Sequence, residues 1–170
     1  MNEFELIKKY FSKLSFYNKY SLNLNDDVFF DRSKKLVISV DTYINKSHFF
    51  DFKKPNLVLK KILRSSISDL ICKGVKPKYY FISGSGNKKT FTKLNLSKIS
   101  LSLKQEQKKF GIYLSGGDTV FSNKLSFTIK FQFRNQIPGE DQNIVTILFI
   151  KFFRSNYGDM ATREKFALFT

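Results

Sequence analysis

The chain has 170 residues, of which 42% are hydrophobic, so it is long and apolar enough for one domain with its own core and is not a disordered tail. Its net charge is +16, but the basic residues are mostly lysines spread along the whole chain, which argues against a dedicated nucleic-acid site. The longest apolar run, Ile144–Phe153, contains Lys151 and is far shorter than the ~20 residues that span a bilayer. With no signal-peptide pattern and a single cysteine, Cys72, we expect a soluble cytoplasmic protein without a membrane partner.

The first quarter of the sequence predicts a helix and then two strands. Phe4, Ile7, Phe11 and Leu14 recur at helical spacing, which indicates an amphipathic helix. Two apolar runs, "VFFD" and "KLVISV", follow and are separated by a polar turn at Arg32–Lys34. The second strand is expected to end at Asp41.

The segment "NLVLKKILRSSISDLICKG" predicts a helix. Gly74 and Pro77 supply its stop, and Cys72 is expected to be a small buried residue within it. The following residues lie along one side of this helix: Leu59, Ile62, Leu63, Ser66, Ile67, Leu70 and Ile71.

The rest of the regular pattern alternates strands with one more helix. "KYYFIS" predicts a strand, and Asn95 is a candidate cap for a helix that runs to about Lys109. "GIYLS" predicts a short buried strand that leads into a turn at Gly116-Gly117. In "KLSFTIKFQF" the residues Leu125, Phe127, Ile129, Phe131 and Phe133 alternate with polar ones, as in an antiparallel strand with two different faces.

Strands interleaved with helices predict an α+β fold, an α/β sandwich. We expect a mixed or antiparallel sheet of about four strands with helices on one face. The pattern is regular through Phe133 and stops near Arg134.

Acidic residues stand at several places that solvation alone explains poorly. Asp27 precedes the first strand, Asp41 ends the second strand, Asp69 lies at the edge of the helical stripe, and Asp118 follows the two glycines. Ser39 shares a strand face with Asp41. Oxygen ligands of this kind suit Mg²⁺, and carboxylates that converged without a cation would repel one another. Each residue alone also fits a turn, a cap or a solvated position.

Five motifs in this order resemble thiamine-monophosphate kinase, a family within the aminoimidazole-ribonucleotide-synthetase-like superfamily. The motifs are "EFELI", "LNLNDDVFF", "SVDTYINKSHFF", "SSISDLICKGVKP" and "YLSGGDTVF". The chain departs from the family pattern at Asn23 and Asn25, where the family has glycines, and at Val40, where it usually has threonine.

The resemblance implies a role for each matching residue. The Mg²⁺ ligands fall on Asp27, Ser39, Asp41, Asp69 and Asp118, and the contact with the ATP phosphates falls on Gly117 and Asp118. The substrate contact falls on His48, although a histidine taken alone is more often structural or merely exposed than functional. No residue is assigned as a nucleophile, an acid or a base, because phosphoryl transfer depends mainly on positioning and charge neutralisation.

The implied activity is Mg²⁺-dependent transfer of the ATP γ-phosphoryl group to thiamine monophosphate, giving thiamine diphosphate. The resemblance also implies a homodimer through the sheet of this domain. From the resemblance we expect residues 1–133 to correspond to the ATP- and Mg²⁺-binding N-terminal domain, and residues 134–170 to be a divergent tail where the family has a second domain.

Three other functions remain open on the sequence. The chain could be a non-catalytic nucleotide-binding fragment, or another ATP-using member of the superfamily. A basic module that binds RNA would need aromatic side chains exposed beside lysines, whereas the phenylalanines here mostly follow core periodicity.

Overall fold

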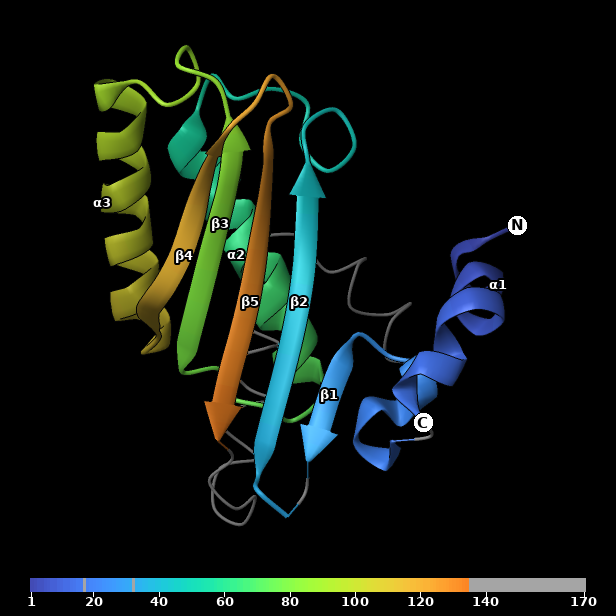
Figure 1. Ribbon diagram of the computed structural model, residues 1–170. Helices are drawn as coiled ribbons and strands as arrows, with labels where there is room; N and C mark the ends of the chain where they lie inside the picture. Colours follow the sequence, from blue (N-terminus) through green and yellow to red (C-terminus); the bar gives the residue numbers. More distant parts are fainter. Residues whose placement is uncertain (17, 32, 135–170) are drawn as a thin grey trace, which may run out of the picture.

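The computed structural model describes residues 1–16, 18–31 and 33–134. Its centre is a five-stranded sheet in the order β1-β2-β5-β3-β4 (Figure 1). The strands are β1 (Val28–Asp31), β2 (Leu36–Ile44), β3 (Tyr79–Gly86), β4 (Tyr113–Phe121) and β5 (Ser126–Arg134). β3 and β4 are parallel, and the other neighbouring pairs are antiparallel. The predicted α+β class is confirmed, with the short β1 as a fifth strand, and the predicted tail lies outside the described residues.

The alternation predicted for β5 is confirmed by burial and by pairing. β5 lies between β2 and β3 and is antiparallel to both. Phe127, Ile129 and Phe131 are buried on one face, whereas Thr128 and Lys130 on the other are only partly covered. The buried side chains belong to the core beneath α2 (Pro55–Cys72), which packs against β2 and β5.

α2 buries the stripe that the sequence predicts, with Ile71 only partly covered, and ends at Cys72, just before the predicted stop at Gly74. Gly74 adopts φ +72°, a conformation that glycine reaches at no steric cost. The amide of Gly74 donates to the carbonyl of Ile71, and the amide of Val75 donates to that of Leu70. This pair of bonds is the Schellman arrangement, and it turns the chain from the helix toward β3. Cys72 is exposed rather than buried, because it lies in the last turn beyond the covered stripe.

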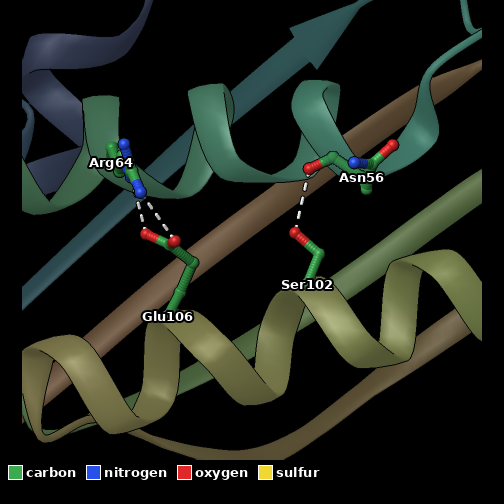
Figure 2. Close-up of polar contacts among 4 residues, drawn as sticks. All are labelled: Asn56, Arg64, Ser102 and Glu106. Atoms are coloured by element: carbon green, nitrogen blue, oxygen red, sulfur yellow. Dashed lines mark hydrogen bonds and ion pairs between the residues drawn. The ribbon is translucent and has the colours of Figure 1, made fainter. Parts of the chain in front are cut away.

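The second long helix, α3 (Lys93–Phe110), packs against α2 (Figure 1). Its cap is Thr92, whose hydroxyl accepts from the Asn95 amide, so Asn95 lies inside the helix and is not its cap. Figure 2 shows the polar seam between the helices. The Arg64 guanidinium binds both oxygens of Glu106, at 2.6 and 2.8 Å, and the Ser102 hydroxyl donates to the Asn56 carbonyl at 2.9 Å. Two-point pairing of this kind fixes the relative rotation of the helices.

The N-terminal segment differs from the single amphipathic helix that the sequence predicts. It consists of α1 (Glu3–Leu6), a π-helical turn (Ile7–Phe11) and 3₁₀ turns (Ser12–Ser15 and Lys19–Leu24). Phe4, Phe11 and Leu14 are largely exposed, since the segment lies beyond β1 at the sheet edge and not over the core (Figure 1). Within the described residues no helix has the length and apolar content that a membrane span requires.

Candidate functional site

The sequence predicts that Asp41 ends its strand. In the structure Asp41 lies within β2, because the strand continues to Ile44. Ser39, Asp41 and Tyr43 alternate with Val40 and Thr42, so the first three side chains share the face that α2 covers. Ser39 and Tyr43 are buried and Asp41 is partly buried. The strand therefore carries one carboxylate into the layer between the sheet and the helix.

The carboxylate of Asp41 has an unusual environment. Burial raises its pKa above the ordinary value, and the nearby carboxylate of Asp27 raises it further. Hydrogen bonding to Ser66 and Ser39 and the charge of Lys73 act in the opposite direction. The Oδ2 atom is buried and has no hydrogen-bond partner among the residues that the structure describes. A buried carboxylate oxygen without a donor calls for a cation or a water molecule.

Asp27 reaches this carboxylate from the loop before β1. Val28 pairs with Ser39, so the start of β1 lies beside the part of β2 that leads to Asp41. The neighbouring Asp26 accepts a hydrogen bond from the Lys73 ammonium at the end of α2. That ion pair connects the loop to the helix, and it brings a positive charge close to Asp41.

Asp69 lies in the last turn of α2, at an exposed position. The charges of Asp69 and Asp41 both raise the pKa of the Tyr43 hydroxyl, after the larger effect of burial, so the phenol lies near both carboxylates. Asp27, Ser39, Asp41 and Asp69 thus gather around one end of α2. No group of three or more His, Cys, Asp or Glu side chains in the described ranges is close enough to hold one metal ion. The carboxylates therefore lie near one another without converging on a single metal position.

Asp118 does not join this group. It pairs with Ser83, which pairs with Thr128, and Thr128 pairs with Thr42. Paired residues share a face of the sheet, so Asp118 lies on the same face as Thr42. This is the open face, which α2 does not cover and to which Asp41 does not point. Three strand spacings separate β4 from β2, on the order of 14 Å. The Gly116-Gly117 pair is not a turn but part of β4, an exposed edge strand and not a buried one.

Gly117 has a steric role within β4. A Cβ atom added there would lie 1.9 Å from the carbonyl oxygen of Ile82. The register between β3 and β4 shifts by one residue just before this position. A glycine is therefore required for β4 to pair with β3, whatever else the motif does.

His48 lies in the loop after β2, close to Tyr43. Its Nδ1 accepts from the amide of Ile44 at 3.0 Å, and its ring meets the ring of Tyr43 edge-on with centroids 5.6 Å apart. With Nδ1 as acceptor, the neutral imidazole carries its proton on Nε2. The Lys61 ammonium, from α2, donates to the backbone carbonyl of His48. This bond holds the backbone that carries the exposed His48 side chain.

Sequence reasoning missed three residues at this site: Tyr43, Ser66 and Lys73. The Tyr43 hydroxyl and the Ser66 hydroxyl are 2.8 Å apart and link β2 to α2. One signal was available, because Tyr43 is two residues from Asp41 on a strand and must share its face. The contact of Lys73 with Asp26 joins residues that are far apart in the chain, so no local sequence pattern predicts it.

A family model described as AIR synthase related protein, N-terminal domain, matches residues 25–132. The chain belongs to this family. The matched range contains all the candidate residues, from Asp27 to Asp118, and leaves out the N-terminal segment with its exposed apolar side chains. The AIR synthase-related domain thus coincides with the sheet and the two long helices.

Individual relatives agree with this assignment. The chain is 32% identical over 136 residues to thiamine-monophosphate kinase of Haemophilus influenzae. The aligned region covers 78% of this chain and 40% of that protein. Two solved structures are each 22% identical. Thiamine monophosphate kinase from Aquifex aeolicus has a TM-score of 0.55 and covers 72% of this chain and 42% of that one. AaThiL complexed with AMPPCP and TMP has a TM-score of 0.63, and the match covers 76% of this chain and 41% of that one. The chain therefore spans less than half the length of these proteins.

Proposed function

We propose that this chain is the Mg²⁺- and nucleotide-binding domain of a thiamine-monophosphate kinase, which transfers the ATP γ-phosphoryl group to thiamine monophosphate and gives thiamine diphosphate. The observation that carries the proposal is the buried Oδ2 of Asp41, which has no hydrogen-bond partner within the described part of the chain, with Asp27 and Asp69 nearby. The name of the Haemophilus influenzae relative and the ligands of the AaThiL complex support the choice of reaction.

The residues at the site fit a magnesium ion. Carboxylate and hydroxyl oxygens are the ligands that Mg²⁺ prefers, and it usually binds through few carboxylates together with substrate phosphates. Asp27, Asp41 and Asp69 would hold it, with Ser39 beside them, once the bound nucleotide draws these carboxylates closer together than they lie in the structure. When bound, the ion offsets the negative charge of the phosphates that must approach one another.

The protein's own part is to hold and orient. Asp41 is held in place by its strand, and Nε2–H of His48 would donate to thiamine monophosphate from the loop beyond Tyr43. Gly117 and Asp118 would meet the ATP phosphates. Because Asp118 lies on the other face of the sheet within one chain, this contact needs a rearrangement of β4 or a second copy of the domain.

We also propose that the open face of the sheet forms a homodimer. Val40 and Ile44 are 52% and 46% exposed there, which is unusual for central-strand aliphatic side chains. A cytoplasmic location follows from the proposed reaction, since ATP is plentiful there. Because the chain spans 40% of its Haemophilus influenzae relative, we propose weak nucleotide binding and negligible turnover for the 170 residues alone.

The test is a calorimetric titration of Mg²⁺–AMPPCP into the purified chain, with and without thiamine monophosphate. We expect weak binding that requires Mg²⁺ and is reduced by Asp69→Asn without loss of the folded state. Thiamine diphosphate formation would be measured next, with the chain alone and with the C-terminal domain of a relative added. Mg²⁺-independent binding, or none at all, would refute the proposal. Binding without turnover in either mixture would favour the alternative, a non-catalytic nucleotide-binding fragment.

A further inference from the structure

Three loops meet at one end of the sheet and carry unpaired lysines. They are residues 45–54 after β2, 87–92 after β3 and 122–125 between β4 and β5. β2 and β3 run in the same direction, because both are antiparallel to β5, so all three loops lie at the same end (Figure 1). The lysines of this loop surface are exposed, and no ion pair is formed by any of them among the described residues: Lys46, Lys53, Lys54, Lys88, Lys89 and Lys124.

The backbones of the three loops are fixed to one another and to the sheet. The Asn45 amide donates to the Leu125 carbonyl at 3.0 Å, and the Ser122 amide donates to the Gly86 carbonyl at 2.8 Å. Beneath the loops, phenylalanines of the first two pack around one phenylalanine of β5, with ring centroids 5.7 to 6.4 Å apart: Phe49, Phe52 and Phe91 around Phe127. The lysines therefore extend into solvent from places that the fold determines.

The charge of this surface is one-sided. Its three loops contain one acidic residue, Asp51, whose carboxylate accepts the backbone amide of Lys53. Toward the other end of the sheet, lysines lie beside acidic groups instead, as in the pair of Lys73 with Asp26. The positive charge at the loop surface is thus not offset locally, as it is near the carboxylates of the proposed cation site.

His48, the proposed substrate contact, belongs to the first of these loops. Its imidazole is oriented by the Ile44 amide at 3.0 Å, and its carbonyl is held by the Lys61 ammonium at 2.7 Å. Lys46 is two residues before it in the same loop. A ligand that approaches His48 therefore passes the loop surface, within about one Debye length of its charges, which is about 8 Å at physiological salt.

We propose that the loop surface captures phosphate-bearing substrates: its lysines attract thiamine monophosphate and the nucleotide from solution and speed their encounter with the site, without holding them once bound. The inference rests on the proposed function, because it concerns the same substrates. A surface with charge of one sign raises the association rate of an oppositely charged ligand by about 10- to 1,000-fold, and salt reduces the effect. Compact ammonium charges on flexible stems suit attraction over a distance better than fixed contact.

The experiment measures association and dissociation rate constants of Mg²⁺–AMPPCP from phosphorus NMR line shapes, which suit weak binding. It is done at about 0.1 M and about 1 M NaCl, where the Debye length is about 10 Å and about 3 Å. The test variant loses one lysine from each loop: Lys53→Gln, Lys88→Gln and Lys124→Gln. The control variant loses the same charge from exposed positions elsewhere: Lys76→Gln, Lys104→Gln and Lys108→Gln.

We expect the test variant to associate about threefold to tenfold more slowly at the lower salt concentration, with its dissociation rate unchanged. The control variant should stay within about twofold of the unmodified chain, and all three proteins should converge at the higher salt concentration. Thermal unfolding shows whether each protein is folded. If the test variant is not, Lys54→Gln with Lys89→Gln removes charge from the same surface and takes its place.

The outcomes separate the two ideas. An unchanged association rate in the folded test variant would overturn the inference and leave the proposed function standing. Equal slowing in both variants would also overturn it, since net charge alone would then be responsible. Faster dissociation with unchanged association would mean that the lysines hold the bound ligand, contrary to the inference. If the unmodified chain does not bind Mg²⁺–AMPPCP, the proposed function fails, and the inference fails with it.

Discussion

At the scale of single residues, the ionised carboxylate of Asp41 is proposed to bind the cation, and it lowers the stability of the folded chain when no cation is bound. Its pKa is raised in the folded state, mainly by burial, so its ionised form opposes folding. This cost is absent below the unfolded pKa and appears as the pH rises through the raised one. We therefore expect Asp41→Asn without metal to be more stable than the unmodified chain at pH 7, with the gain fading toward pH 4.

Thermal unfolding of both forms at several pH values measures the Asp41→Asn effect. Adding Mg²⁺ and nucleotide should stabilise the unmodified chain and not the variant, which reverses their order. A variant that is less stable at pH 7 without metal would show that the carboxylate contributes to folding and not to binding.

Lys73 is a second residue whose charge affects the site. Its ammonium pairs with Asp26 and lowers the pKa of Asp41, so it partly neutralises the acidic group and competes with a cation. We expect Lys73→Met to tighten Mg²⁺ binding by about threefold to tenfold, the effect of about 1 kcal/mol of lost repulsion. Folding stability should fall by less than about 1 kcal/mol, because both partners are about one-third exposed. Lys76→Met removes an exposed neighbouring charge and should change neither quantity. Weaker Mg²⁺ binding in Lys73→Met would show that the ion pair is needed to hold the loop.

At the scale of elements, the attachment of β4 depends on a glycine. The Cβ of Gly117→Ala would lie 1.9 Å from the Ile82 carbonyl oxygen, and backbone cannot yield as a flexible side chain can. We expect a loss of about 2–4 kcal/mol in the free energy of unfolding, or detachment of β4 from the sheet. Gly84→Ala is the matched change in β3, where the added atom meets a Phe127 ring carbon at 3.3 Å and a small shift suffices. Urea denaturation compares them, and equal losses would mean that β4 pairs differently in solution.

At the scale of the whole molecule, the open face of the sheet should decide the oligomeric state. Val40 is 52% exposed on that face, and Leu101, 59% exposed, lies on α3 on the helical side. We expect Val40→Asp to shift a dimer to monomer and Leu101→Asp to leave it intact, because a charge buried in a sheet-to-sheet contact without a partner is costly. Light scattering over a range of concentrations measures the mass. A dimer that survives Val40→Asp and dissociates with Leu101→Asp would move the interface to the helices.

The sequence by itself determined the elements whose signal is local. The alternation in β5 and the apolar stripe of α2 follow from periods of two and 3.6 residues, and each predicted the buried face. The order of the motifs indicated the family, and the placement of Ser39 and Asp41 on one strand face needed only strand geometry. The N-terminal segment has a helical period too, but a period shows only that one side is apolar, not that a partner covers that side.

Only the tertiary structure decided which faces meet. Asp118 lies on the open face because of strand order and a one-residue register shift, and these depend on residues far away in the chain. The same holds for the Tyr43–Ser66 contact and for the Lys73–Asp26 pair, which join a strand or loop to a helix. Local propensities fix what each segment becomes. The environment of a carboxylate, and hence the pKa of Asp41, is set by packing between segments, which exists only once the chain has folded.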